Sequence, residues 1–140
     1  MTTLQHKFVD TIPEELEEGI LYISIPYDTI IHSCCCGCGN EVVTPLSPSQ
    51  WSFTYDGETI SINPSIGNWS LNCQSHYYIK ENRIIWSRYY SDHEIKHVRN
   101  VDISDNTKQF QKDVDTKRNS ILFKITSIWK SIFPKRIKKR

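Results

Sequence analysis

The sequence predicts a small, mainly β domain of about six strands, followed by a C-terminal amphipathic helix. Over residues 20–88, short runs of β-branched and aromatic residues alternate with polar ones, and turn residues separate them. This spacing is typical of a compact sandwich, meander or small barrel. From residue 119 onwards, apolar residues recur at helical spacing. We therefore expect a β domain at residues 1–91, a polar linker at 92–118, partly helical or disordered, and a basic amphipathic helix and tail at 119–140.

The expected strands follow from alternation and from the turn residues between them. Asp56-Gly57 is a strong signal for a tight hairpin turn, and Glu81-Asn82 marks the tip of a second hairpin. The expected strands cover residues 20–32, 41–46, 51–55, 59–62, 75–80 and 83–87.

The charge of the chain is unevenly distributed. Residues 1–100 carry 12 acidic and 6 basic side chains, a net charge of −6, whereas residues 101–140 carry a net charge of +7. The acidic body argues against nucleic acid as a partner of the β domain. The tail has to be considered apart from the body.

The N-terminal residues carry four glutamates where a secretory signal needs an apolar run, so we expect a cytoplasmic location. In a reducing compartment, the five cysteines are not expected to form a disulfide framework. Neighbouring thiols are then better explained as metal ligands or redox groups.

Four of the five cysteines lie at residues 34–38, and the fifth, Cys73, lies on a separate hairpin. Zinc favours four tetrahedral ligands, and thiolates suit it well. A small β domain has a limited core, which a structural metal commonly reinforces. Buried free thiols are the simpler alternative, but four cysteines within five residues favour zinc.

The alternation of side chains along an extended segment selects among the ligands. Cys34 and Cys36 share one side while Cys35 faces away, and a turn at Gly37 can bring Cys38 back. The sequence therefore predicts the zinc ligands Cys34, Cys36, Cys38 and Cys73. The competing set combines Cys35, Cys38 and Cys73 with His76 or His32.

Three motifs resemble a bacterial family. They are H-x-C-x-C-G-C-G at residues 32–39, P-S-I-G-N-W at 64–69 and C-x-S-H-Y at 73–77. Together with the surrounding residues 6–88, they resemble the BubE-like peptidase component of bacterial ubiquitin-like conjugation operons. The chain has Cys35 where we expect the family to have another residue, which argues against Cys35 as a ligand.

The resemblance implies a zinc-containing serine peptidase that processes a ubiquitin-like protein or removes it from its targets. Such chemistry needs a hydroxyl nucleophile, a base within hydrogen-bond reach and donors for the oxyanion. Ser65 and Ser75 are the candidate nucleophiles, and Asn68 can donate to an oxyanion. His76 is the expected base, and His32 is the second choice. Because neighbours on a strand face opposite sides, a nucleophilic Ser75 would need His32 instead.

Two other functions compete with this one. The first is a zinc-binding adaptor module that recruits a partner in the same pathway without catalysing a reaction. The second is a redox sensor that uses the spare thiol of Cys35. Substitution of the serines and of His76 distinguishes them, because only the enzyme loses turnover while it keeps its metal and fold.

The C-terminal helix has an apolar face from Ile121 to Phe133, followed by a basic end at residues 135–140. The apolar stretch is shorter than the roughly 20 residues that a membrane span needs. It can instead lie on an anionic membrane surface, or pack on a protein partner. The sequence leaves both alternatives open.

Overall fold

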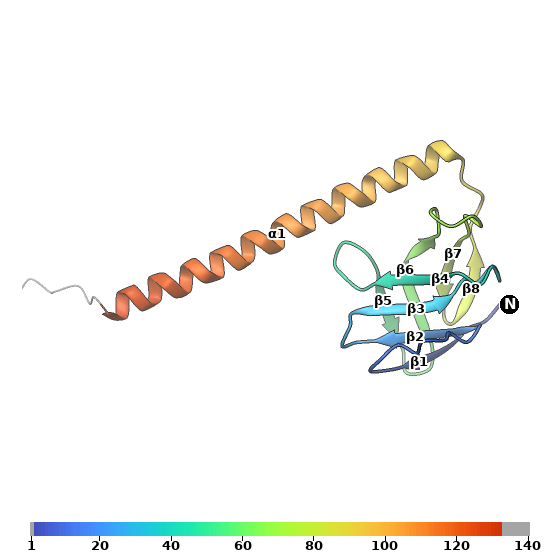
Figure 1. Cartoon of the computed structure of the whole chain (residues 1–140), viewed down its shortest axis with the longest axis horizontal. Coiled ribbons are helices and arrows are strands. Elements are labelled where there is room, and N and C mark those ends of the chain that lie inside the picture. The colour runs from blue at the N-terminus through green and yellow to red at the C-terminus, as the bar shows by residue number, and fades with distance from the viewer. Residues whose placement is uncertain (1, 133–140) are drawn as a thin grey trace, which may run out of the picture. The chain divides into compact units, whose positions relative to one another are not determined.

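The structure is a computed structural model that describes residues 2–132, with side chains described up to residue 124. The described residues divide into two units, residues 2–102 and residues 103–132. The first unit holds all the strands and the start of the helix, and the second holds the rest of the helix (Figure 1).

The first sheet contains four strands in the order in which they occur in the chain. The first strand pairs in parallel with the second, and the other pairs are antiparallel. The strands are β1 (Gln5–Phe8), β2 (Ile20–Ser24), β3 (Thr29–Ser33) and β4 (Glu41–Pro45).

The second sheet is an antiparallel meander of four strands, also in chain order. Its first hairpin turns at Asp56-Gly57, and its last at Glu81-Asn82, both as predicted. Glu81 and Asn82 have positive φ angles of 51° and 60°, as a two-residue hairpin turn of this hand requires. The strands are β5 (Ser52–Tyr55), β6 (Ile60–Gly67), β7 (His76–Lys80) and β8 (Arg83–Trp86).

The hydrophobic core lies between the two sheets and draws side chains from both (Figure 1). All five residues of β2 are buried, and two of them, Leu21 and Ile23, belong to one core cluster with the inward residues of β6 and β7. The fully buried members include Leu21, Ile23, Ile30, Ile60 and Tyr77. The predicted fold class, a mainly β domain followed by a C-terminal helix, is confirmed.

The structure has eight strands where about six were expected. A turn at residues 25–28 divides the expected strand at 20–32 into β2 and β3, and Asp28 has a positive φ of 47° in that turn. β1 was not predicted, because its residues are mostly polar and largely exposed. It is recruited by backbone pairing to β2, which needs no apolar face.

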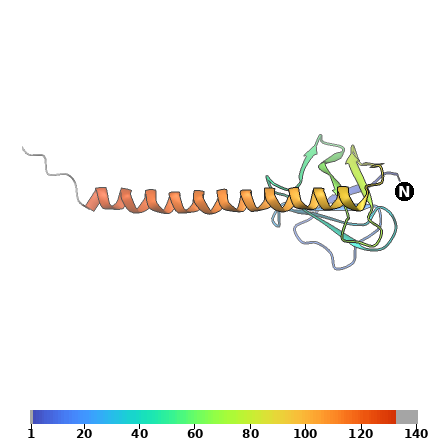
Figure 2. The same cartoon turned by 90° about the horizontal axis from the view of Figure 1, so that it is seen from above.

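One continuous helix, α1 (Asp92–Ile132), covers both the expected linker at 92–118 and the start of the expected amphipathic helix (Figure 2). Ile121 and Leu122 are exposed. The side chains from residue 125 on, with most of the expected apolar face, lie outside the described part, as does the basic end at 135–140. Among the described residues, no helix combines the length and apolarity that crossing a membrane requires.

The core makes a matched pair of substitutions informative. Ile23 is fully buried in β2, whereas Ile25, two residues later, is 54% exposed. Ile23→Ala should lower the free energy of unfolding by about 2–5 kcal/mol, because it leaves a cavity between the sheets. Ile25→Ala should change it by less than about 0.5 kcal/mol. Urea unfolding followed by circular dichroism measures both, and similar losses in the two variants would contradict this assignment of the core.

Candidate functional site

The strand β6 leaves regular pairing between Ile62 and Ile66, where three of its residues lie opposite one residue of β7. Such a bulge redirects the side chains that follow it. The Asn63–Pro64 peptide bond in this stretch is cis. Ser65 is the last residue of the bulge, and Trp51 Nε1 donates a hydrogen bond of 3.3 Å to its carbonyl oxygen. The bulge therefore sets the position of Ser65.

Beyond the bulge, β6 and β7 pair regularly, with Ile66 opposite Tyr77 and Gly67 opposite His76. Paired residues share a face of the sheet, and faces alternate along each strand. Ile66 and Tyr77 point into the core, so Ser65 and His76 lie together on the outer face. The Ser65 Oγ lies 2.9 Å from the His76 Nε2, within hydrogen-bond distance.

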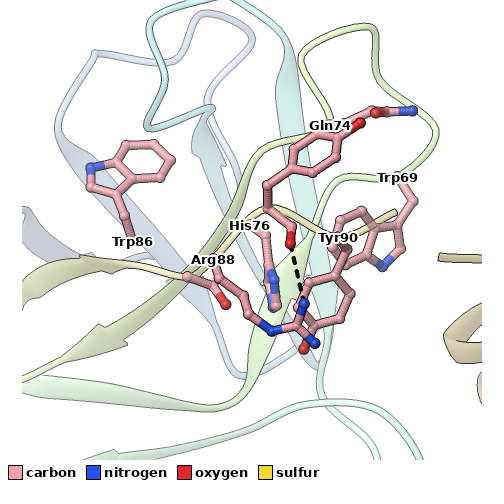
Figure 3. A pocket seen from close by; sticks show the side chains of 8 residues that line it. Trp69, Gln74, His76, Trp86, Arg88 and Tyr90 are labelled. Carbon is pink, nitrogen blue, oxygen red and sulfur yellow. Dashed lines mark hydrogen bonds between the residues drawn. The ribbon is translucent and has the colours of Figure 1, made fainter. Parts of the chain in front are cut away.

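Aromatic rings cover His76 on the outer face, so it is only 7% exposed. The ring of Trp69 lies 4.8 Å from the imidazole and that of Tyr90 lies 4.6 Å from it, measured between centroids. Gly67 leaves room for Trp69, because a Cβ at residue 67 would lie 2.4 Å from the indole. A cavity of about 200 Å³ beside His76 is also lined by Trp86 (Figure 3).

The surroundings of His76 favour its neutral form. Burial lowers the pKa of His76, and the positive charge of Arg88 lowers it further. Its Nδ1 is buried and accepts or donates no hydrogen bond within the described part of the chain. A neutral imidazole can accept the proton of a serine hydroxyl, as a general base must.

The cysteine-rich segment is the loop between β3 and β4. A hydrogen bond of 2.8 Å from Cys34 N to Asn40 O closes this loop. Gly37 and Gly39 have φ angles of 80° and 76°, which residues with a side chain rarely adopt. At these two glycines the backbone of the loop changes direction, so that the side chains of alternate cysteines can converge on one side.

Four sulfurs meet where this loop approaches the loop between β6 and β7. The Sγ of Cys34 lies 3.4 Å from that of Cys36 and 4.0 Å from that of Cys73. Together with that of Cys38, these sulfurs all lie within 4.8 Å of one another. Sulfurs bound to one zinc ion at about 2.3 Å lie about 3.8 Å apart in a tetrahedron. The four cysteines are therefore placed where they could hold one metal ion.

The thiols of this cluster differ in acidity. Hydrogen bonds from Asn40 lower the pKa of Cys38 to about 6. Desolvation and neighbouring thiols raise the pKa of Cys36 to about 12. Cys35 is not one of the four clustered cysteines and packs against the core, where burial raises its pKa to about 11.

Ser75 and His32 lie on the inner side of the sheet, away from the pair formed by Ser65 and His76. The Ser75 Oγ lies 3.2 Å from the Cys34 Sγ and accepts a hydrogen bond of 2.8 Å from Asn68 Nδ2. His32 is fully buried, and its Nε2 lies 2.8 Å from the Tyr77 hydroxyl. Burial lowers the pKa of His32 to about 4.

The structure thus brings together Ser65 and His76, but it does not bring Ser75 within reach of His32, because Tyr77 and Asn68 lie between them. The side chain of Asn68, which was expected to serve an oxyanion, is directed at Ser75 and Tyr77 instead. Neither His32 nor His76 joins the four clustered sulfurs.

Two residues beside His76 were not predicted from the sequence, the aromatic Tyr90 and the charged Arg88. Tyr90 and Arg88 follow β8 in a segment with no motif, and no spacing rule connects them to a histidine twelve or more residues earlier. Trp69 lies in the P-S-I-G-N-W motif, but the motif does not reveal that its ring covers His76. The buried hydroxyl of Tyr77, which joins His32 to the cysteine side, also gave no signal.

A family model described as "bacterial ubiquitination-like system serine protease (BubE)" matches residues 8–87, more than half of the chain. The match includes both candidate serines, His76 and all five cysteines. Comparisons with curated proteins and with solved structures gave no match.

The cysteine cluster predicts a different outcome for two adjacent residues. Cys36→Ser should abolish the binding of a metal ion, because one of the four converging sulfurs is lost. Cys35→Ser should leave about one ion per chain, because its thiol packs against the core. Elemental analysis by mass spectrometry of the purified variants measures this. Loss of the ion from Cys35→Ser, with retention in Cys36→Ser, would exclude this ligand set.

Proposed function

Because the chain belongs to the bacterial ubiquitination-like system serine protease (BubE) family, we propose that it is a serine peptidase with Ser65 as nucleophile and His76 as base. The observation that carries this proposal is the 2.9 Å distance between Ser65 Oγ and His76 Nε2. Nucleophile and base within hydrogen-bond reach are the arrangement that activates a serine hydroxyl.

The chemistry proceeds in two steps on these two side chains. His76 Nε2 takes the hydroxyl proton as Ser65 Oγ attacks the carbonyl carbon of the scissile bond, and His76 then gives that proton to the leaving group. An acyl group remains on Ser65. A water molecule then attacks the acyl carbon as His76 takes its proton, and His76 gives that proton to Ser65 Oγ as the acyl group leaves as a carboxylic acid.

The substrate we propose is a ubiquitin-like protein, cut at its C-terminal region either in its precursor or in its conjugates. The family description supports a ubiquitin-like partner. The cavity of about 200 Å³ beside His76 supports the entry of part of that C-terminal region next to the base.

We further propose that Cys34, Cys36, Cys38 and Cys73 hold a zinc ion. When bound, zinc would tie the β3–β4 loop to the β6–β7 loop and so stabilise the fold. Four thiolates leave no open position for water, which supports a structural role. The hydroxyl of Ser75 lies within 3.5 Å of the sulfurs of Cys34 and Cys73, where it can hydrogen-bond a thiolate.

The assignment of the nucleophile distinguishes two serines of the same chain. Ser65→Ala and His76→Ala should each reduce cleavage of a fusion to the cognate ubiquitin-like protein by about 10⁶-fold, because a nucleophile and its base act as one unit. Ser75→Ala should retain cleavage with only weakened metal binding, and Ser104→Ala, at an exposed serine of α1, serves as the control. Mass spectrometry of the cleavage products, with metal content and melting temperature of each variant, measures this.

Full activity of both Ser65→Ala and His76→Ala would contradict the proposal. If the wild-type chain binds the ubiquitin-like protein without cleaving it, the chain is an adaptor module of the same pathway. A fluorophosphonate probe that labels Ser75, and not Ser65, would move the nucleophile to the cysteine side of the sheet.

The environment of His76 predicts the acid limb of the pH profile. A base works in its neutral form, and the lowered pKa of His76 keeps it neutral to a lower pH than an exposed histidine. The value of kcat/KM should therefore fall only as the pH drops through a midpoint below about 6.5. A midpoint at or above about 6.5 in the measured profile would show that His76 is not in this environment.

A further inference from the structure

The segment Arg88–Ser91 joins β8 to α1 and lies beyond the residues that match the family model, which end at residue 87. It nevertheless contributes a direct neighbour of the candidate base. The ring of Tyr90 meets the His76 imidazole edge to face, with centroids 4.6 Å apart and an angle of 80° between the planes.

Only one nitrogen of the His76 imidazole has a hydrogen-bond partner among the described residues. Packing therefore has to fix the orientation of the ring. Nε2 contacts Ser65, while the buried Nδ1 has no hydrogen-bond partner among the described residues. In a serine–histidine pair, the second nitrogen is commonly held by a carboxylate. Here the rings of Trp69 and Tyr90 enclose the imidazole instead.

Tyr90 is itself held on both sides. Its ring stacks on Trp69 at 5.3 Å with an angle of 20° between the planes, and the guanidinium of Arg88 lies 4.5 Å from its centroid (Figure 3). Stacked rings and a cation over a ring are both favourable arrangements. Tyr90 therefore has a defined position against His76.

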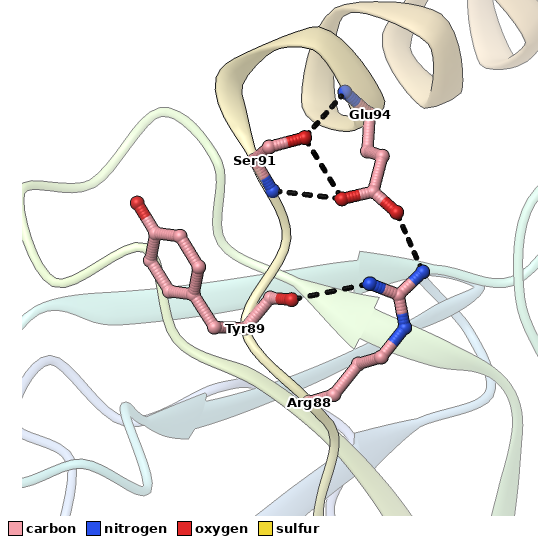
Figure 4. Close-up of polar contacts among 4 residues, drawn as sticks. All are labelled: Arg88, Tyr89, Ser91 and Glu94. Carbon is pink, nitrogen blue, oxygen red and sulfur yellow. Dashed lines mark hydrogen bonds and ion pairs between the residues drawn. The ribbon is translucent and has the colours of Figure 1, made fainter.

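The start of α1 holds Arg88 in turn. Arg88 Nη2 donates to Glu94 Oε1 at 2.6 Å, while Glu94 Oε2 accepts hydrogen bonds from Ser91 N at 2.9 Å and from Ser91 Oγ at 2.8 Å (Figure 4). Ser91 and Glu94 form a capping box, which fixes the first turn of a helix. One carboxylate thus caps the helix and anchors the cation that lies over Tyr90.

We propose that Tyr90 is a positioning residue that orients His76 towards Ser65, and that the ion pair between Arg88 and Glu94 holds Tyr90 in place. The proposal rests on the proposed function for its kinetic consequence only, since the orientation of His76 can be measured without a substrate. A displaced base cannot take the serine proton efficiently, even when the substrate still binds.

Kinetics of the full-length chain test the positioning role. Tyr90→Ala should lower kcat about 100-fold and leave KM within about twofold, whereas Tyr90→Phe should retain the wild-type kcat, because the contacts with His76 and Trp69 are made by the ring. A rise in KM with unchanged kcat would overturn the proposal and make Tyr90 a substrate contact. Equal losses in Tyr90→Phe and Tyr90→Ala would also overturn it.

Nuclear magnetic resonance of the His76 imidazole nitrogens gives a readout without a substrate. The wild type should show one tautomer, with the proton on Nδ1 and Nε2 facing Ser65. Tyr90→Ala should mix the tautomers and raise the pKa of His76 towards its usual value, because the ring becomes hydrated. The other titratable groups around the imidazole are Arg88 and Tyr78, and neither is replaced in this variant.

The two readouts fail independently. If the tautomer and the pKa of His76 change in Tyr90→Ala, but neither the wild type nor any variant cleaves a substrate, the positioning role holds and the proposed function is wrong. If neither changes, the positioning role is wrong whatever the activity.

The ion pair has its own matched test. Glu94→Gln removes the charge that holds Arg88 but can still cap the helix through its amide. We expect a two- to fivefold loss of kcat at about the wild-type melting temperature, since exposed ion pairs are weak. Arg83→Gln, which breaks another exposed ion pair, the one between Arg83 and Glu81, is the control. Equal effects of the two substitutions would exclude a role for Glu94.

Discussion

The alternation of side chains along β7 is the constraint on which the rest of the candidate site depends. The side chain of His76 projects from the outer face of the sheet. That of Tyr77 projects from the inner face, where it is fully buried. A shift of pairing by one residue would exchange the two. The bulge in β6 then places Ser65 on the outer face beside His76, and Ile66 returns to the core. A short strand pair thus separates the pair Ser65–His76 from the cysteine cluster.

On the inner side of this strand pair, buried polar groups connect the core to the cysteine cluster. On the inner side, His32, Tyr77, Asn68 and Ser75 form a chain of hydrogen bonds that ends at the sulfur of Cys34. Buried polar groups need such partners, because leaving one unpaired is costly. The cysteine loops are therefore held by the core of the domain as well as by their own turns.

Much of the fold could be predicted because its signals are local. Asp56-Gly57 and Glu81-Asn82 mark hairpins by turn chemistry alone, and the cysteines gather within a few residues of the sequence. β1 could not be predicted, because its pairing partner lies elsewhere in the chain and its own residues are polar. For the site, alternation separated Cys35 from its neighbours and Ser75 from His76. Tyr90 meets His76 only through tertiary packing, which no spacing rule encodes.

The placement of the four sulfurs on two loops has a consequence for the unfolded chain. Cys34, Cys36 and Cys38 lie close together in sequence, whereas Cys73 follows only after β4, β5 and β6. An ion that bridges them would close a loop containing those three strands, and loop closure reduces the conformational entropy of the unfolded ensemble. During synthesis, three sulfurs would be available well before the fourth. All four sulfurs could then bind one ion only after strands of both sheets had folded.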